Sequence, residues 1–323
     1  MRLLFALLLL AAAPAEAFLF GRSSDKNAAD SLGGMRSAFN GGDCVTVLAL
    51  SENFLKEKPP AAMREEAYGY MGRCYEAAGS TDKAISFYKV ALGLYPENSL
   101  FSSSLAQIYN QAGFPENAAP LFLQVLSLSP DDLPANLGLA RAYAALGFFS
   151  RAAEFYAKGA ALQNYADLPA LEEYARCLLR KRDWGGAAFI SAKGRAAAPR
   201  SALWPLLEAR AWAGRGDYYK AVEALDAALR YESNRRLRLE RALYLLLGGL
   251  PRRAAEAADA ELALAAGDPL ASAVKGMALY SLGEKTAAAP YFAAARSGGP
   301  FVSKIAGAFL NGSAPGPEDA CKK

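Results

Sequence analysis

The sequence predicts an all-α fold built from a repeated pair of helices, and three observations carry this prediction. Residues 65–98, 99–132 and 133–166 share one arrangement of large, small and turn residues, and each block begins 34 residues after the last. Within each block the apolar residues recur at spacings of three and four, which is typical of amphipathic helices. Alanine is abundant and runs of β-branched residues are scarce, which disfavours strands.

The turn residues of the block explain where its two helices end. In residues 65–98 the first helix is expected over residues 65–78 and the second over residues 82–94. Gly79 lies between them, and glycine ends a helix at low cost because it adopts positive φ readily. Pro96 cannot continue a helix, so the chain turns there.

The small and large residues of the block explain how the two helices pack. Gly72 and Ala84 are small enough to let the helices approach closely, and Tyr75 and Tyr88 are expected to fill the space that remains. The same classes recur as Gly79, Gly113 and Gly147; as Tyr75, Tyr109 and Tyr143; as Ala84, Ala118 and Ala152; and as Tyr88, Phe122 and Tyr156.

In these positions the sequence resembles the tetratricopeptide repeat (TPR) family through three consecutive blocks. The resemblance implies a right-handed superhelical solenoid in which each helix pair packs on its neighbours. It also implies that the first helices of the pairs line a concave groove, and that this groove binds peptide segments of partner proteins.

Weaker copies of the pattern extend the repeats in both directions. About eight TPR-like hairpins are expected, starting near residues 28, 65, 99, 133, 168, 202, 235 and 269. The predicted segments are a degenerate first repeat (28–61), three clear repeats (65–166), four divergent repeats (168–302), a C-terminal capping helix (303–311) and a disordered tail (312–323). In the fifth pair Arg182 replaces the turn glycine and Ser191 the aromatic residue, so Trp184 is a candidate to fill that space.

The first 17 residues have the features of a secretory signal peptide. Arg2 precedes the apolar stretch Leu3–Ala13, and Ala15-Glu16-Ala17 matches an A-x-A cleavage site. This stretch is shorter than the roughly 20 residues that span a bilayer, so cleavage after Ala17 is favoured over an uncleaved anchor. Residues 18–29 are then a lead-in linker. The mature protein is expected to be exported without a transmembrane span, to the periplasm or cell envelope if it is bacterial and otherwise secreted.

Four cysteines bear on the compartment. Cys44 and Cys74 fall on helices that are expected to be neighbours, so they can form a disulfide in an oxidising compartment. The alternative is that both are small buried thiols. Cys177 is expected in the core, and Cys321 lies in the tail, where it is open to pairing between two copies of the protein. The absence of a C-x-x-C motif leaves a thiolate metal site without support.

The sequence offers no evident site of catalysis. It contains no histidine, which excludes the triads and zinc motifs that depend on imidazole. The adjacent carboxylates Asp131-Asp132 and Glu172-Glu173 are expected as helix caps or solvated residues, because neighbours along a helix point in different directions. We therefore expect a non-enzymatic protein with no cofactor and no metal. The net charge of +4 is too diffuse to indicate a nucleic-acid partner.

A row of arginines is the candidate binding surface. The groove-facing position of the first helix is arginine in five of the first six pairs, and the candidate residues are Arg36, Arg73, Gln107, Asn110, Arg141, Arg176 and Arg210. Guanidinium groups suit bidentate binding of carboxylates, which favours an acidic peptide or a C-terminal carboxylate as the ligand. In the alternative, the arginines are solvated or are paired with Glu66, Glu76, Glu172 or Glu208.

These features together predict an exported protein–protein interaction scaffold that binds partner peptides in a mostly basic groove and supports assembly of a cell-envelope or secretion machine. The alternative is a carbohydrate- or cell-wall-associated accessory protein that contacts polysaccharide. A second basic cluster comprises Arg235, Arg236, Arg238 and Arg241. It is expected to be a solvated face, with contact to anionic lipid or a sugar polymer as the alternative.

Overall fold

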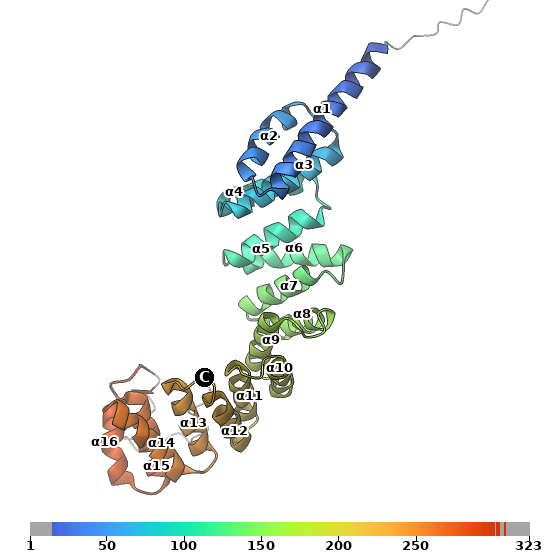
Figure 1. Ribbon diagram of the computed structural model, residues 1–323. Coiled ribbons are helices and arrows are strands. Elements are labelled where there is room, and N and C mark those ends of the chain that lie inside the picture. Colours follow the sequence, from blue (N-terminus) through green and yellow to red (C-terminus); the bar gives the residue numbers. More distant parts are fainter. Residues whose placement is uncertain (1–14, 301, 304–306, 308–323) are drawn as a thin grey trace, which may run out of the picture. The chain divides into compact units, whose positions relative to one another are not determined.

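The computed structural model describes residues 15–300, 302, 303 and 307, and every regular element in these residues is an α-helix (Figure 1). Residues 1–14 of the predicted signal peptide, the predicted tail and most of the predicted capping helix lie outside the described residues. The helices are α1 (Ala15–Asn40), α2 (Cys44–Lys56), α3 (Ala61–Ala77), α4 (Thr81–Leu94), α5 (Ser99–Gln111), α6 (Pro115–Leu128), α7 (Leu133–Ala145), α8 (Phe149–Leu162), α9 (Leu168–Lys181), α10 (Trp184–Ala197), α11 (Leu203–Gly214), α12 (Tyr218–Leu229), α13 (Arg235–Leu247), α14 (Pro251–Leu264), α15 (Pro269–Ser281) and α16 (Lys285–Ala295).

These helices follow the predicted order of eight consecutive pairs, which confirms the all-α repeat fold. The N-terminal boundaries differ from the prediction. Helix α1 begins at Ala15, so residues 18–29, which were expected to be a linker, are helical; they contain no proline that would stop a helix. Helix α3 begins four residues earlier than expected, directly after Pro60, because proline is tolerated at a helix start.

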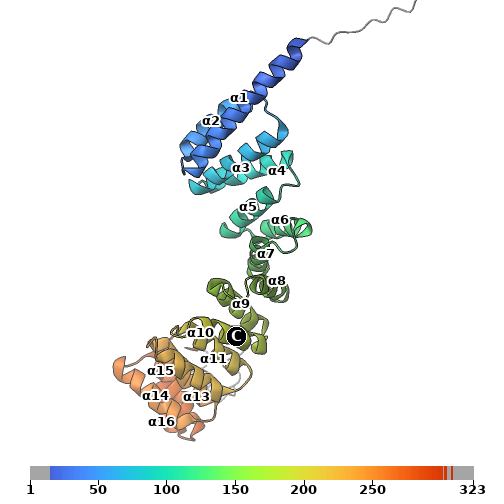
Figure 2. The ribbon, with the colours of Figure 1, turned by 45° about the vertical axis from the view of Figure 1, so that its right-hand side comes forward.

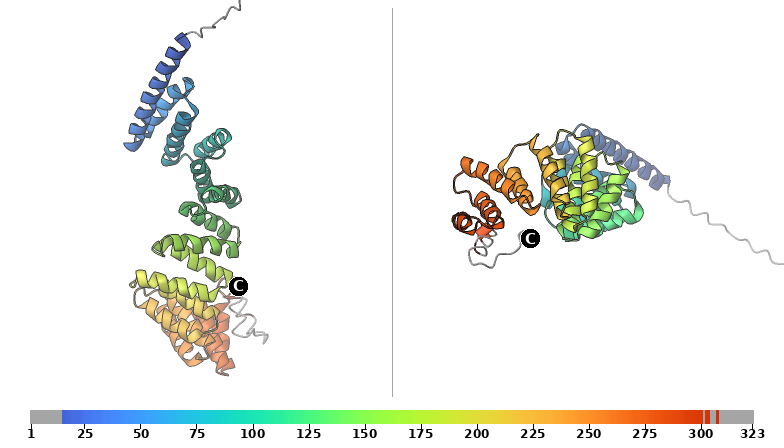
Figure 3. Two further views of the ribbon diagram at one scale, coloured as in Figure 1. Left: turned by 90° about the vertical axis from the view of Figure 1, so that its right-hand side faces the viewer. Right: turned by 90° about the horizontal axis from the view of Figure 1, so that it is seen from below.

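The chain divides into two compact units, Met1–Leu146 and Gly147–Lys323. In the first unit the pairs α1–α2, α3–α4 and α5–α6 succeed one another in sequence order, followed by α7 (Figure 2). In the second unit the helices from α9 to α16 also pack on their sequence neighbours (Figure 3). Each unit has its own buried residues. Within a unit, each repeat packs mainly on the adjacent repeats.

Small residues permit close packing in the first unit, as the sequence predicted. The ring of Tyr88 lies directly over Gly72, so a Cβ atom at Gly72 would be 2.5 Å from Tyr88 Cζ. Phe122 covers Gly138 in the same way, and a Cβ atom there would be 2.3 Å from Phe122 Cζ. Real Cβ atoms do not approach a ring this closely, so both positions require glycine unless the ring moves.

The second unit keeps this arrangement at Gly276, which Phe292 covers, and adds tryptophan packing between α10 and α11. Trp204 is 2% exposed and lies over Gly194, and Trp184 lies over Gly214. The predicted role of Trp184 as a packing residue is therefore shared with Trp204, which comes from α11. Ser191, which occupies the aromatic position of the repeat, is buried and donates a hydrogen bond from Oγ to the carbonyl oxygen of Ala187 at 2.7 Å.

The first two repeats are joined covalently. Cys44 at the start of α2 and Cys74 in α3 form a disulfide, with their Cα atoms 5.2 Å apart. Of the two alternatives that the sequence left open, the structure has the bridge. Cys177 is a buried free thiol, as predicted, and burial raises its pKa to about 11. A thiol with such a pKa is inert at neutral pH.

Candidate functional site

The structure places every predicted site residue on the first helix of a pair. Four of these helices belong to the first unit and two to the second: α1 carries Arg36, α3 carries Arg73, α5 carries Gln107 and Asn110, α7 carries Arg141, α9 carries Arg176, and α11 carries Arg210. Their surroundings differ, and these differences decide which of them can meet a partner through charge.

Arg36 is held by two residues of the next first helix. Its Nε and Nη2 atoms donate to Glu66 Oε1 at 3.0 and 2.6 Å, and its Nε lies 3.3 Å from the hydroxyl of Tyr70. The Tyr70 hydroxyl donates to the same Glu66 oxygen at 2.7 Å. The hydrogen bond from Tyr70, and then the one from Arg36, lower the pKa of Glu66. The carboxylate therefore stays ionised and neutralises Arg36.

The same three residue types form a second cluster in the second unit. Arg210 Nε and Nη2 donate to Glu240 Oε1 and Oε2 at 2.9 and 3.0 Å, and the Tyr244 hydroxyl donates to Glu240 Oε1 at 2.9 Å. In both clusters the glutamate follows the arginine by 30 residues and the tyrosine follows the glutamate by four. We call this arrangement the Arg-Glu-Tyr clasp, because it joins successive first helices.

The sequence did not indicate Glu240, because the glutamates expected to pair with the arginines were Glu66, Glu76, Glu172 and Glu208. Glu208, which was an expected partner of the arginine row, pairs instead with Arg195 of α10 at 3.1 Å. Glu76, another expected partner, accepts a hydrogen bond from the Tyr88 hydroxyl. A separation of 30 residues between arginine and glutamate would have indicated Glu240. This separation is one repeat less about one helical turn, so it places the two side chains next to each other on adjacent first helices.

The remaining positions of the row are partly engaged. Arg176 donates to Glu172 on its own helix at 2.9 and 2.6 Å, and Asn110 Nδ2 donates to the carbonyl oxygen of Gly138 at 2.8 Å. The Arg73 guanidinium lies over the ring of Phe39, with Cζ 5.7 Å from the ring centroid. Among the described residues Arg73 has no carboxylate within ion-pair distance.

The expected pairing to glutamate thus holds for Arg36 through Glu66 and for Arg176 through Glu172. Arg210 is neutralised as well, by Glu240 rather than by an expected residue. Arg73 differs from these three because its guanidinium contacts an aromatic ring and forms no ion pair among the described residues. The row is therefore a series of separate charge environments.

Three arginines of the second basic cluster form ion pairs, whereas a solvated face was expected. The cluster lies on α13: Arg235 pairs with Asp268, which caps α15, Arg238 with Glu261 of α14, and Arg241 with Asp226 of α12. Glu261 is only 2% exposed, so Arg238 compensates a buried charge. These ion pairs link α13 to its neighbours.

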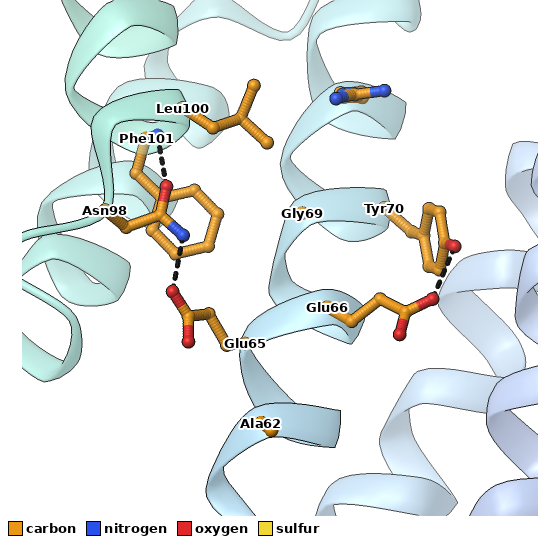
Figure 4. A pocket seen from close by; sticks show the side chains of 9 residues that line it. Ala62, Glu65, Glu66, Gly69, Tyr70, Asn98, Leu100 and Phe101 are labelled. Atoms are coloured by element: carbon orange, nitrogen blue, oxygen red, sulfur yellow. Dashed lines mark hydrogen bonds between the residues drawn. The ribbon is translucent and has the colours of Figure 1, made fainter. Parts of the chain in front are cut away.

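A pocket of about 460 Å³ lies between α3 and α5 in the first unit (Figure 4). Asn98 organises one wall: its Oδ1 accepts from the backbone N–H of Phe101 at 2.9 Å, and its Nδ2 donates to Glu65 Oε1 at 2.6 Å. The pocket is lined by Ala62, Glu65, Glu66, Gly69, Tyr70, Arg73, Asn98, Leu100 and Phe101. It therefore combines two carboxylates, one arginine and an apolar wall.

Gly69 lines the centre of this pocket and leaves it open, because glycine has no side chain. In Figure 4 it lies on α3 between Leu100 on one side and Tyr70 on the other. A Cβ atom at Gly69 would be 3.8 Å from Leu100 Cδ2, which is ordinary contact, so a longer side chain there would extend toward this wall. Sequence reasoning found Arg73 but missed Gly69, which lies one helical turn before Arg73 on the same face.

Comparisons with known proteins agree with the repeat assignment. Family models described as "Tetratricopeptide repeat" match residues 65–98 and residues 109–167. The chain therefore carries TPR repeats, and TPR proteins bind protein partners. A search of curated proteins finds no match.

Several solved structures share the fold. A tetratricopeptide repeat protein from Parabacteroides merdae is 15% identical, with a TM-score of 0.51 over 79% of this chain and 99% of that one. YrrB, described as a TPR protein with an unusual peptide-binding site, is 19% identical, with a TM-score of 0.50 over 53% of this chain and 88% of that one. The structure of Naa15/Naa10 bound to HypK-THB is 16% identical, with a TM-score of 0.50 over 77% of this chain and 39% of that one. At these identities the similarity shows the fold alone.

Within the part of the chain that the structure describes, no helix combines the length and the apolar composition that crossing a membrane requires.

Proposed function

We propose that this protein is an exported interaction scaffold that captures segments of partner proteins along its first helices and so supports assembly of a cell-envelope or secretion machine. The observation that carries the capture is the pocket between α3 and α5, where polar and apolar side chains face an open surface. The TPR fold is typically a non-enzymatic scaffold, which agrees with such a role. YrrB, whose solved structure has a similar fold, is described as having a peptide-binding site.

Two independent features support export. The N-terminal sequence combines a basic start, an apolar stretch and an A-x-A site. The Cys44–Cys74 disulfide fits an oxidising compartment, since reducing conditions in the cytosol keep most thiols free. We propose the periplasm or cell envelope as the location if the source is bacterial, and secretion otherwise.

Recognition of acidic partner segments centres on Arg73 in this proposal. Arg36, Arg176 and Arg210 are each neutralised by a glutamate, so a ligand carboxylate would have to displace an existing partner. Arg73 has no such partner among the described residues and borders the pocket. The basic character of the groove is therefore local, and a partner carboxylate would pair with Arg73 in an exposed setting.

Capture of partner proteins from an envelope or secretory extract tests the scaffold role. Protein purified after expression of the full sequence would be used as bait beside an Arg73→Ala variant, at low and at physiological salt. The matched control is Arg176→Ala, because Arg176 is already paired on its own helix. We expect partner recovery to fall with Arg73→Ala and with salt, and to persist with Arg176→Ala. Failure of the unaltered protein to retain any partner would contradict the scaffold role.

Processing tests the export proposal. The intact mass of the protein isolated from the exported fraction should correspond to a polypeptide that begins at Phe18. Changing Ala15 and Ala17 to leucine should block this processing, because the cleavage site requires small residues. An unprocessed polypeptide that remains in the cytoplasm would contradict export.

A further inference from the structure

We infer that the pocket between α3 and α5 is a specificity site for an extended peptide in which a basic and an acidic side chain, three or four residues apart, flank an apolar one. This inference rests on the proposed function and adds the chemistry of the partner segment to it. The main supporting observation is that the pocket has opposite charges at its two ends and an apolar surface between them.

The centre of the pocket is suited to an apolar side chain. Gly69 contributes no side chain, and its nearest neighbours are Leu100 Cδ2 and Phe101 Cε1, which would lie 3.8 and 4.0 Å from a Cβ atom. Phe101 is fully buried and fixed, whereas Leu100 is 39% exposed. Tyr70 lies on the other side of Gly69 in Figure 4. An apolar ligand side chain over Gly69 would cover exposed apolar surface of Leu100.

One end of the pocket is acidic and already ordered. Asn98 holds Glu65 through Oε1, while Arg36 and Tyr70 hold Glu66 through Oε1. Within the described residues, Oε2 of each carboxylate accepts no hydrogen bond. A lysine or arginine of the ligand can therefore bind these oxygens without breaking an existing contact, and little side-chain entropy is lost because both carboxylates are held in place.

The other end of the pocket is basic. The Arg73 guanidinium lies against the Phe39 ring and has no ion pair among the described residues, which leaves its donors available to a ligand carboxylate. The disulfide and the clasp of Arg36 both connect α3 to the preceding repeat, so they hold the helix that carries both ends of the pocket.

The distance between the two ends sets the spacing of the ligand charges. Glu65 and Glu66 precede Arg73 by eight and seven residues on one helix, which corresponds to roughly 10–12 Å at about 1.5 Å per residue. An extended peptide rises by about 3.3 Å per residue, so three or four residues cover that distance. The geometry therefore selects a short segment of mixed charge rather than a uniformly acidic one.

Synthetic peptides test this inference directly. Two probes, acetyl-Gly-Ser-Lys-Ser-Leu-Ser-Glu-Ser-Gly-amide and the same peptide with Lys and Glu exchanged, cover both peptide directions. Three controls carry Lys at both charged positions, Glu at both charged positions, or Ser in place of Leu. Calorimetric titration of the purified protein should give at least about fivefold tighter binding for one mixed-charge probe than for every control. Equal affinities for the mixed-charge and control peptides would overturn the inference.

Two variants separate the roles of shape and charge. Gly69→Leu fills the centre of the pocket with a residue that favours helix, so it should abolish binding of the probe while helical content and melting temperature stay the same or rise. Arg73→Glu should reverse the preference, so that the peptide with two lysines binds better than the mixed-charge probe. Unchanged probe binding by Gly69→Leu, or an unchanged order of affinities with Arg73→Glu, would contradict the assigned site.

Partner capture then distinguishes this inference from the proposed function. If Gly69→Leu retains the same extract proteins as the unaltered protein, the scaffold role stands and the pocket is not its specificity site. If the unaltered protein retains none, the proposed function itself fails. Loss of partners in Gly69→Leu, together with binding of a mixed-charge probe by the unaltered protein, supports both.

Discussion

Single glycines carry much of the packing in this protein, and they do so in two distinct ways. Gly138 is needed because a ring occupies the space of a side chain, whereas the glycines between paired helices are needed for their positive φ. The exception is Arg182, which adopts φ +64 at the end of α9 although it is not glycine. Replacing glycine at Gly138 should therefore lower stability, whereas introducing glycine at Arg182 should raise it.

Gly138→Ala should lower the free energy of unfolding by about 1–3 kcal/mol, because the new methyl group overlaps the ring of Phe122. The matched control is Gly93→Ala in α4, where no atom lies within 4 Å of the new Cβ. That change should stabilise the protein by several tenths of a kcal/mol or more, since alanine favours helix. Urea denaturation measures both variants, and equal shifts in the two would contradict the packing at Gly138.

Arg182→Gly should raise the free energy of unfolding by about 0.5–1 kcal/mol. The left-handed conformation is unfavourable for a residue with a Cβ atom, and glycine removes most of that cost. Arg182→Ala retains the Cβ atom and serves as the control, so it should leave stability nearly unchanged. A gain with alanine as large as that with glycine would mean that the arginine side chain, rather than its backbone, is unfavourable.

At the scale of helices, covalent and ionic contacts between neighbouring repeats supplement the apolar core. The disulfide joins α2 to α3, and the Arg-Glu-Tyr clasp joins α1 to α3. A second clasp joins α11 to α13 within the other unit. Each connection acts on adjacent repeats, so the loss of any one should have a local effect.

Replacing both Cys44 and Cys74 with serine should destabilise the first repeats by about 2–4 kcal/mol, because the bridge closes a loop between residues 30 apart in sequence. Hydrogen exchange should speed up in α1, α2 and α3 and remain unchanged in α9 to α16. Reductant added to the unaltered protein should reproduce this pattern. Uniform loss of protection along the whole protein would show that the repeats unfold as one unit.

A double-mutant cycle on Arg210 and Glu240 should give a coupling free energy of about 1 kcal/mol. The corresponding cycle on Arg36 and Glu66 should give less, because solvent weakens charge pairing between exposed side chains. The exposed fractions are 29% and 16% for the first pair and 55% and 35% for the second. Thermal denaturation of the single and double variants measures both cycles, and a larger coupling in the first unit would contradict this ranking.

At the scale of the whole molecule, the absence of histidine shapes the response to pH. No side chain has an ordinary pKa near 6.5, and the buried thiol of Cys177 titrates near pH 11. Hydrogen bonds from Tyr70 and Arg36 lower the pKa of Glu66, and hydrogen bonds from Lys220 lower that of Asp217. The protein therefore has its main pH-sensitive contacts on the acidic side of neutrality.

Stability should be nearly constant between about pH 5.5 and 7 and should fall in acid. A carboxylate whose pKa is lowered by folding stabilises the native state fully above its ordinary value, which is 4.5 for Glu66. That contribution is lost as the pH falls below this value and through the lower native pKa. Urea midpoints at pH 7, 5.5 and 3 measure the profile, and Glu66→Gln should reduce the acid-side loss. A steep change between pH 5.5 and 7 would contradict this account.

The repeat period was sufficient to predict most of the helices, because each residue type acts through local geometry. Gly79 and Gly113 end helices by adopting positive φ, and Gly72 and Tyr88 pack together as their spacing indicated. The start of α1 was not predicted, since residues 18–29 lack the regular apolar spacing on which the helix prediction depended. A missing pattern favours a linker only where some residue also stops the helix, and nothing in this segment does so.

The sequence by itself determined the helix pairs, the class of protein and the helices that carry the candidate residues, because the period relates each residue to its counterpart one repeat away. Only the tertiary structure decided that Cys44 and Cys74 are bridged, that Glu240 rather than Glu208 neutralises Arg210, and that Gly69 opens a pocket. These features depend on the distances between side chains of different helices. Apolar spacing and turn residues fix the helices, but packing alone decides how the side chains between them are arranged.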